Sequence, residues 1–352
     1  MELAAREVGT WRLVAQRVVP ALDDAAAVVE HLAAVQAQDL RAAATAVALR
    51  TPAGTTTGLA AALDAGRVVR SWPMRGTLHL LPAADLPWVL GLCAGRVAAA
   101  TARIRRQRGT TESDLVAARE IAEEFLTRSG RATRAELLAA FQDGGQATGG
   151  QRGYDLVVHL ALTGVLCLGP LAGREQLFVL VADWIRERRA PADPLAEWAR
   201  RYLRGHGPAT PADFATWAGL TLGGARRGFA AVRDEFEAVL VDGVEHLLDP
   251  GLPDLVAAHR RAARALHVLP GFDEFLLGYG DRRHVLPAEH ADRVAPGGNG
   301  VFRGTVVVGG RVVGTWTRKG AGITTEAFTG FSTAQEAALA RRERRLPSGW
   351  LG

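Results

Sequence analysis

Two glutamines separated by one alanine, Gln36 and Gln38, are the polar residues whose spacing most invites a chemical interpretation. They lie in the largely apolar stretch His31-Leu-Ala-Ala-Val-Gln-Ala-Gln-Asp39, and each amide offers both a donor and an acceptor. On an α-helix, residues two apart point about 200° apart, so the amides would share a target only in an extended segment or a helix-terminal turn. Asp39 and the helix expected after it favour an extended segment or a turn at the two glutamines. The alternative is that both glutamines only satisfy buried backbone groups.

Other catalytic patterns are absent from the sequence. It contains no Gly-x-Ser-x-Gly elbow, no Walker loop, no His-Glu-x-x-His and no paired Cys-x-x-Cys. The nine histidines lack metal-ligand spacing, and Cys93 and Cys167 are too few for a disulfide framework or a structural zinc site. We therefore expect neither a metal nor a cofactor.

Composition indicates a globular protein rather than a disordered or membrane-spanning one. With 352 residues, the chain is expected to form two or three domains at roughly 150 residues each. Its hydrophobic content is 48%, yet no run approaches the roughly 20 uninterrupted apolar residues of a membrane helix. The first residues lack the basic-then-apolar order of a signal peptide. We expect a cytoplasmic monomer without a membrane partner.

The positive charge of the chain comes almost entirely from arginine. The net charge of +5 permits a polyanionic partner, and Lys319 is the single lysine among 42 basic residues. A genome rich in G and C would account for that bias. Whatever its origin, chemistry that needs an amine nucleophile has only Lys319 and the N-terminus to draw on.

Three rounds of helices followed by a β-ribbon organise the first 250 residues. In the first round, periodicity and turn residues predict helices over 5–18, 23–35, 41–50 and 59–63 before strands 68–72 and 76–81. In the second round they predict helices over 112–127, 133–141 and 149–163 before strands 165–168 and 176–180. In the third round they predict helices over 195–204, 211–219 and 222–232 before strands within 237–248. The capping-box pattern Thr133-Arg-Ala-Glu136 supports the start of one of these helices. Three helices and a ribbon are typical of a winged helix.

The chain changes character after Pro250. One helix is expected over 254–266, followed by a Gly-rich tail with strands 304–308 and 311–316. The predicted fold is therefore α+β, mostly α, with three tandem winged-helix domains and a β-containing lobe packed on the third. The expected boundaries are 1–110, 111–190, 191–250 and 251–352.

With these elements in place, the motif Gln36-Ala37-Gln38 resembles the Gln-Φ-Gln motif of the AlkZ/YcaQ family of winged-helix DNA glycosylases, with Ala37 as a small version of the apolar residue. Three further stretches resemble segments of that family: Ser-Trp-Pro-Met-Arg-Gly-Thr-Leu-His-Leu at 71–80, Leu-Pro-Gly-Phe-Asp-Glu-Phe-Leu-Leu-Gly-Tyr-Gly-Asp-Arg at 269–282, and the strand pair within 302–316. The resemblance spans about residues 7–320. The YcaQ-like branch has Asp where this chain has Gln38, so the chain is more similar to the AlkZ-like branch.

The resemblance implies a monofunctional glycosylase of double-stranded DNA that hydrolyses the N-glycosidic bond of cationic N7-alkylated purines, including bulky adducts and interstrand crosslinks. Some members protect producers of DNA-alkylating antibiotics, and a nucleoid-associated location would follow. Gln36 and Gln38 would then be catalytic. Because such a base is already a good leaving group, neutral amides that hold a water and face the oxocarbenium-like sugar would suffice. Asp39 is a possible supporting carboxylate, although it should point away if the glutamines converge.

A crosslinked base cannot readily flip into a tight pocket, so an inserted ribbon should grip the duplex. On the first ribbon, Thr77 and His79 are candidate DNA contacts, and Arg75 is a candidate phosphate contact. The alternative for His79 is an ordinary exposed strand residue. A second candidate phosphate-binding cluster contains Arg103, Arg105, Arg106 and Arg108. The alternative is that these arginines form only a solvated face.

Four polar residues of the late stretch remain ambiguous: Asp273, Tyr279, Asp281 and Arg282. They could support catalysis, but we favour a scaffold role, with Asp281 and Arg282 as a structural ion pair. A second hypothesis for the whole chain is a non-catalytic winged-helix regulator, which should dimerise and protect a specific palindrome.

Overall fold

The computed structural model describes residues 2–298, 300–320 and 322–347. The fold is mixed α+β and mostly helical. Backbone contacts divide the chain into two compact units, one formed by residues 1–59 with 195–352 and the other by residues 60–194. This division differs from the four consecutive segments predicted, because the first of them, 1–110, contributes to both units.

The first unit contains the N-terminal helices and the whole chain after the second unit. Its helices of eight residues or more are α1 (Val8–Ala15), α2 (Ala25–Leu32), α3 (Leu40–Ala48), α10 (Pro194–His206), α11 (Pro211–Ala218), α12 (Leu222–Ala231), α13 (Leu252–Ala263) and α16 (Thr333–Glu343). Its shorter helical turns are η1 (Ala5–Glu7), η3 (Arg233–Glu235), α14 (Glu274–Leu277), η4 (Ala288–His290), α15 (Ala291–Val294) and η5 (Pro296–Gly298). Its strands are β1 (Val35–Gln36), β6 (Glu237–Val241), β7 (Val244–Leu248), β8 (His267–Leu269), β9 (Gly304–Val308), β10 (Arg311–Lys319) and β11 (Gly322–Ala327).

Local sequence signals account for the third helix-and-ribbon round, α10 to β7. Thr210 caps α11, where its hydroxyl accepts the Asp213 amide at 3.2 Å and the Asp213 carboxylate accepts the Thr210 amide at 3.1 Å. The antiparallel strands β6 and β7 are joined at Asp242-Gly243, which have φ angles of 48° and 76°. Positive φ at both central residues suits the right-handed twist of a tight hairpin, and Asp-Gly is a preferred pair there. The predicted order of three helices and a ribbon is confirmed in this segment.

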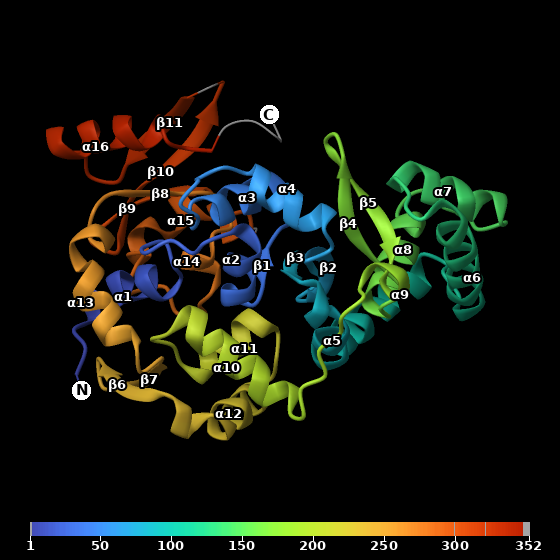
Figure 1. Cartoon of the computed structure of the whole chain (residues 1–352), viewed down its shortest axis with the longest axis horizontal. Coiled ribbons are helices and arrows are strands. Elements are labelled where there is room, and N and C mark those ends of the chain that lie inside the picture. Colours follow the sequence, from blue (N-terminus) through green and yellow to red (C-terminus); the bar gives the residue numbers. More distant parts are fainter. Residues whose placement is uncertain (1, 299, 321, 348–352) are drawn as a thin grey trace. The chain divides into compact units, whose positions relative to one another are not determined.

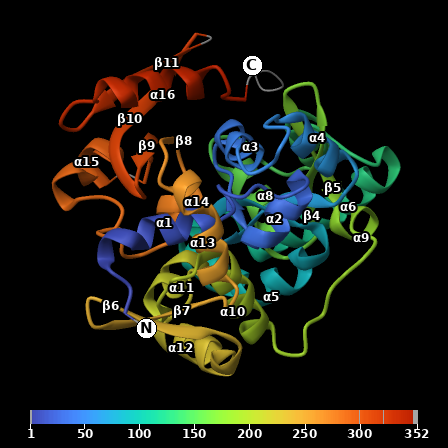
Figure 2. The same ribbon diagram turned by 60° about the vertical axis from the view of Figure 1, so that its left-hand side comes forward.

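A four-stranded antiparallel sheet, in the order β11-β10-β9-β8, forms the C-terminal part of the first unit. Helix α16 lies beside it in both ribbon views (Figures 1 and 2) and contacts β8. Ser332 caps α16 by accepting the Gln335 amide at 3.3 Å. The sequence predicted β9 and β10 but neither β8, β11 nor α16.

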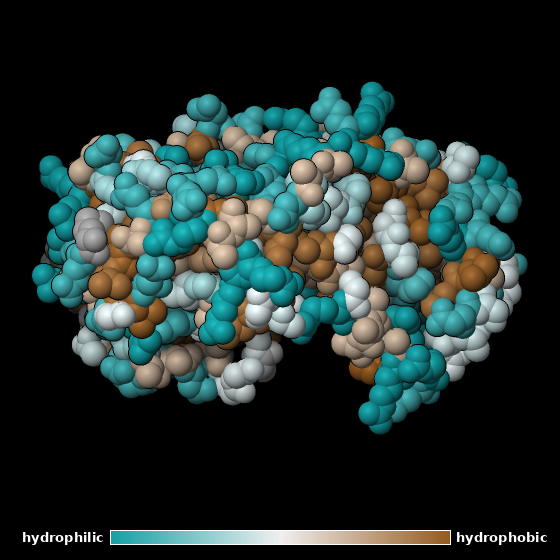
Figure 3. All heavy atoms as spheres, turned by 90° about the horizontal axis from the view of Figure 1, so that it is seen from below, coloured by the Kyte–Doolittle hydropathy of each residue, from teal (hydrophilic) through white to brown (hydrophobic). Residues whose placement is uncertain are grey.

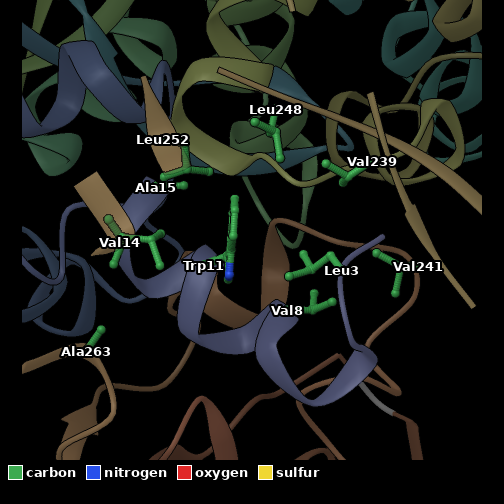
Figure 4. Packing of buried hydrophobic residues seen from close by; sticks show 11 residues of the cluster. Leu3, Val8, Trp11, Val14, Ala15, Val239, Val241, Leu248, Leu252 and Ala263 are labelled. Atoms are coloured by element: carbon green, nitrogen blue, oxygen red, sulfur yellow. The ribbon is translucent and has the colours of Figure 1, made fainter. Parts of the chain in front are cut away.

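Trp11 lies at the centre of a core that joins distant parts of the first unit. Figure 4 shows its indole among aliphatic side chains from α1, from the β6–β7 ribbon and from α13. The cluster contains Leu3, Val8, Trp11, Val14, Ala15, Val239, Val241, Leu248, Leu252, Val256 and Ala263. Full burial of a valine or leucine side chain contributes about 1.5–3 kcal/mol to the stability of the folded state. This core holds the N-terminal helix against the C-terminal half of the chain.

The second unit combines two ribbons in one sheet. Its elements are α4 (Thr57–Asp64, which crosses the boundary), β2 (Val68–Met74), β3 (Thr77–Pro82), η2 (Ala83–Asp85), α5 (Leu86–Gln107), α6 (Glu112–Ser129), α7 (Arg134–Asp143), α8 (Arg152–Leu162), β4 (Leu166–Ala172), β5 (Glu175–Leu180) and α9 (Val181–Trp184). The two predicted ribbons, β2–β3 and β4–β5, pair through Arg70 and Leu168 in the order β3-β2-β4-β5. Helices α6 and α7 both contact β5 (Figure 1). The capping box at Thr133 and Glu136 is confirmed at the start of α7.

The 22-residue helix α5 was not predicted from the sequence. Gly91 and Gly95 interrupt its periodic pattern and lower its intrinsic helix propensity. Among the described residues, Ala83–Gln107 is also the one helical stretch that is long and apolar enough, by length and composition, to cross a membrane. Half of its most apolar segment is buried inside the protein. On the face drawn in Figure 3, hydrophilic side chains are interspersed with smaller hydrophobic patches.

Candidate active site

The Gln36-Ala37-Gln38 segment lies in the first unit between helices α2 and α3. Helix α2 ends at Leu32 rather than at the predicted residue 35, because Ala33 turns the chain with a φ of 63°. Gln36 then lies in the short strand β1, so the predicted break in helix geometry is confirmed. Gln36 is buried, Ala37 is fully buried and Gln38 is exposed. One glutamine is therefore anchored in the protein while the other reaches its surface.

Asp39 is the N-cap of α3. Its Oδ1 accepts the backbone amides of Arg41 at 2.9 Å and Ala42 at 3.1 Å. A carboxylate at this position satisfies amides that have no partner within the helix and interacts favourably with the helix dipole. The carboxylate of Asp39 thus has a structural task, which argues against the supporting chemical role considered for it.

A residue that sequence reasoning missed, Glu274, holds the backbone of the motif. Its Oε1 accepts the Gln36 amide at 3.0 Å, and its Oε2 accepts the indole Nε1 of Trp217 at 3.0 Å. The imidazole Nε2 of His206 lies 3.3 Å from the same Oε2. Glu274 and His206 are fully buried. The available signal was an acid inside the apolar run Phe-Asp-Glu-Phe-Leu-Leu, where the neighbouring Asp273 already accounts for a helix cap.

Asp273 is part of a buried scaffold. Both of its carboxylate oxygens accept from Arg50, at 2.8 and 2.9 Å, and Oδ1 also caps α14 by accepting the Phe275 amide. Burial by itself lowers the pKa of Arg50, but the adjacent Asp273 carboxylate outweighs it and raises that pKa above its ordinary value. The Nε of Arg50 donates to the Gln16 carbonyl at 2.9 Å. This pair supports the scaffold interpretation.

Tyr279 belongs to the same scaffold. Its hydroxyl donates to the His206 carbonyl at 2.8 Å and accepts from Gln16 Nε2 at 3.1 Å. The guanidinium of Arg12 lies over its ring at 3.4 Å from the centroid. Burial raises the pKa of Tyr279 well above its usual range, with Arg12 opposing that shift. The phenol therefore stays protonated and does not act as a base.

The predicted ion pair between Asp281 and Arg282 is wrong. Asp281 pairs with Arg283 instead, at 2.7 Å. Arg282 donates from Nε to the Leu276 carbonyl at 2.7 Å, and its guanidinium lies 5.1 Å from the centre of the Phe302 ring. Adjacent side chains in a turn point in different directions, so sequence proximity did not produce a pair.

Burial keeps His31 and the two cysteines in their neutral forms. The Nε2 of His31 lies 2.6 Å from the Ala15 carbonyl, which only accepts, so that nitrogen bears the hydrogen. Burial lowers the pKa of His31 to about 4 and raises the pKa of the Cys93 and Cys167 thiols to about 12. Within the described residues, no group of three or more His, Cys, Asp or Glu is arranged to hold a metal ion.

The β2–β3 ribbon of the second unit carries the predicted DNA contacts, but His79 is fully buried. Its Nδ1 lies 2.9 Å from the Thr77 carbonyl, and its Nε2 lies 2.9 Å from Nη2 of Arg75. Burial, and then the charge of Arg75, lower the pKa of His79 well below its usual value. A neutral ring that donates from Nδ1 and accepts at Nε2 fits both contacts. His79 therefore orients Arg75, whereas a direct contact from its ring to DNA would require these bonds to break.

Thr77 and Arg75 are the half-buried members of this ribbon. Arg75 adopts a φ of 58° at the turn, where it precedes Gly76 with a φ of 70°. The hydroxyl of Thr77 is buried without a hydrogen-bond partner among the described residues. Of the predicted ribbon contacts, Arg75 is the half-buried cation, and its Nη2 contacts His79.

The four arginines of the predicted cluster, at the C-terminal end of α5, lie in different environments. Arg103 and Arg106 are exposed and lie one helical turn apart. Arg105 is buried, contrary to the phosphate contact predicted for it, and its Nη1 donates to the Thr101 hydroxyl at 3.0 Å. Arg108 pairs with Asp155 at 2.7 Å. Two members of the cluster thus remain as outward-facing cations.

Comparisons with known proteins agree with this architecture. Residues 29–347 match the AlkZ-like DNA glycosylase family. The chain is 31% identical over 336 residues to an interstrand DNA cross-link repair glycosylase of Streptomyces sahachiroi, covering 90% of this chain and 88% of that protein. The solved structure of Streptomyces sahachiroi DNA glycosylase AlkZ superposes with a TM-score of 0.79 at 26% identity, over 98% of this chain and 96% of the other.

The family match extends over most of the chain and includes both Gln36 and Glu274. A match of this extent, together with a relative above 30% identity over nearly its whole length, establishes the relationship. The chain belongs to the AlkZ-like family of DNA glycosylases.

Proposed function

We propose that this chain hydrolyses the N-glycosidic bond of cationic N7-alkylated purines in duplex DNA, including bulky adducts and interstrand crosslinks. Gln36 and Gln38 hold the attacking water and direct their carbonyl dipoles at the sugar. The observation that carries the proposal is the extended, anchored Gln36 segment, in which the adjacent carboxylate of Asp39 is engaged as a helix cap. The motif therefore contributes neutral amides, since its neighbouring carboxylate caps α3.

Neutral amides suit this class of substrate for an electrostatic reason. An N7-alkylated purine carries a positive charge, so its bond to the sugar breaks without strong acid assistance. The costly step is the positive charge that develops on the sugar, and oriented carbonyl dipoles stabilise it without reorganisation. An amide is too weak a base to activate water for an unactivated purine. The enzyme should therefore discriminate strongly in favour of cationic lesions.

Two features fit action on duplex DNA. The family relative from Streptomyces sahachiroi is described as an interstrand cross-link repair glycosylase. Arg103 and Arg106 also face outward from α5 in the second unit, where cations suit a polyanionic partner. In a cell, removal of such lesions would confer resistance to a DNA-alkylating compound.

A base-release assay tests the proposal with three duplexes that carry N7-methylguanine, a bulky N7 adduct or an N7 crosslink. Gln36→Ala and Gln38→Ala should each lower the single-turnover rate by about 100-fold, the scale expected when one interaction that stabilises the transition state is removed. Gln151→Ala is the matched control, because Gln151 is exposed and makes no side-chain cap. Folded variants that release N7-methylguanine at the parental rate would overturn the assignment. Protection of a specific palindrome without base release would instead indicate a regulator.

A further inference from the structure

The backbone around Gln36 adopts a conformation that needs an external anchor. Ala33, three residues before Gln36, has a φ of 63°, and Phe272, two residues before Glu274, has a φ of 61°. Positive φ at a residue with a side chain is energetically unfavourable and persists when surrounding contacts enforce it. The hydrogen bond from the Gln36 amide to Glu274 Oε1 joins these two strained segments. A bond from an amide to a carboxylate is stronger than one between neutral groups.

The carboxylate of Glu274 is itself fixed in place. The indole of Trp217 donates to Oε2, and the imidazole of His206 contacts the same oxygen. The Nδ1 of His206 lies 3.2 Å from the Tyr202 carbonyl, which places a hydrogen on Nδ1. A Cβ at Gly278 would lie 2.5 Å from Cδ2 of His206, so glycine is what lets this imidazole approach.

The backbone of Glu274 is held as firmly as its side chain. Asp273, which precedes it, is clamped by both terminal nitrogens of Arg50. The carbonyl of Glu274 accepts from Gln16 Nε2 at 2.9 Å. All of these groups are buried. The result is a continuous, rigid path from the interior of the first unit to the amide of Gln36.

We propose that Glu274 is a positioning residue, which sets the place of Gln36 through its backbone amide and so aligns the Gln36 carboxamide with the attacking water. The inference rests on the proposed function of Gln36. Glu274 touches neither DNA nor water in this role. It contributes to the rate because a misplacement of about 1 Å at a reacting group costs about 100-fold.

Glu274→Gln is the most conservative test. The new carbonyl oxygen can still accept the Gln36 amide, but the new NH₂ group then faces the indole N–H of Trp217, donor against donor. The side chain must shift, and Gln36 shifts with it. We expect the single-turnover rate of N7-methylguanine release to fall by about 10- to 100-fold, while the Kd for the lesion-bearing duplex changes less than about threefold.

A double-mutant cycle separates positioning from general structural damage. In a Gln36→Ala background no carboxamide remains to be aligned, so Glu274→Gln should lower the rate no further. A purely structural role of Glu274 would multiply the two losses. Full multiplication of the two rate effects, in protein corrected for its active fraction, therefore overturns the positioning role.

Milder variants keep the test decisive if Glu274→Gln does not fold. Trp217→Phe keeps an aromatic ring and removes the indole donor to Glu274 together with part of the ring volume, so it should lower the rate several-fold. Trp198→Phe is its matched control, since Trp198 is a buried neighbour with ring centroids 5.0 Å apart. Equal rates in these two variants would contradict the proposal.

Asp213→Asn is the second control. Asp213 is a buried carboxylate in the same unit that completes the capping box of α11 by accepting the Thr210 amide, and it also accepts the amides of Gly280 and Asp281. Its loss should lower the melting temperature but leave the rate per folded molecule unchanged. If Gln36→Ala is impaired and Glu274→Gln is not, the positioning role alone fails. If Gln36→Ala itself has the parental rate, the proposed function of the motif fails first.

Discussion

The backbone amide of Gln36 and the carboxylate of Glu274 meet at 3.0 Å although 238 positions separate them in the sequence. This contact ties the motif between α2 and α3 to the turn that begins α14. Both ends are buried, so the bond forms in a low-dielectric interior where an unpaired amide or carboxylate would be costly. The motif is thereby part of the core of the first unit, and substitutions in that core should reach its function and stability.

The Arg50–Asp273 pair should be essential to folding. Arg50→Met removes the guanidinium and leaves Asp273 buried without its partner, which should lower the free energy of unfolding by about 3–5 kcal/mol. Urea denaturation measures the change. The control Arg119→Ala breaks an exposed pair with Glu123 one turn along α6 and should cost less than about 1 kcal/mol. Equal losses in the two variants would contradict the expectation that the buried pair contributes more to the free energy of unfolding than the exposed pair.

Stability should fall as the pH drops from 7.5 toward 5. Burial, followed by the charge of Arg342, lowers the pKa of His267 to about 4, whereas the ordinary value is 6.5. Below pH 6.5 the unfolded chain binds a proton at this histidine that the folded protein does not, so protonation favours unfolding. His79 adds to the effect because its pKa is also lowered. Each such histidine lowers the free energy of unfolding by at most about 1.4 kcal/mol per pH unit in this pH range.

Urea titrations at pH 7.5, 6.5 and 5.5 measure the slope of the free energy of unfolding against pH. Above pH 5 the unfolded carboxyl groups are already largely ionised, so they add little to it. His267→Gln should flatten the slope, because glutamine cannot bind the proton and can still donate to the carbonyls of Ala262 and Ala263. A slope that His267→Gln leaves unchanged would rule out this histidine as a source.

Arg103 and Arg106 should contribute to DNA affinity without reading sequence. Replacing both by alanine removes up to two phosphate contacts, which should weaken binding by similar factors on unrelated duplexes. The slope of log K against log salt concentration should decrease by roughly 1 for each arginine that binds a phosphate in the parent. Fluorescence anisotropy at several salt concentrations gives both numbers. Arg119→Ala, with its arginine already paired to Glu123, should leave affinity and slope near those of the parent.

Base release should not be accompanied by strand scission. Lyase chemistry needs an amine that forms a Schiff base with the sugar, and the only lysine, Lys319, is an exposed residue at the end of β10. The abasic product should be cut only after alkaline treatment, and borohydride should trap no covalent complex. Lys319→Ala should release base at the parental rate. A trapped complex that Lys319→Ala abolishes would contradict the monofunctional assignment.

Short-range signals were enough to predict most elements of this chain. The capping pair Thr133–Glu136 acts between residues three positions apart, so its chemistry is visible in the sequence. The resemblance of Gln36-Ala37-Gln38 to a family motif, reinforced by three further stretches, was likewise a property of the sequence. Among the elements that were missed, α5 could not be recognised locally, because Gly91 and Gly95 obscure a helix stabilised by tertiary burial.

The tertiary structure alone decided which polar groups are free to act. His79 is buried and contacts Arg75, and Arg105 is buried whereas Arg103 and Arg106 are exposed. Burial and long-range hydrogen bonding have no sequence signature, because they depend on what another segment places opposite a residue. Glu274 is the clearest case: its neighbours in sequence indicate only the start of a short helix, and only the fold brings it to the amide of Gln36.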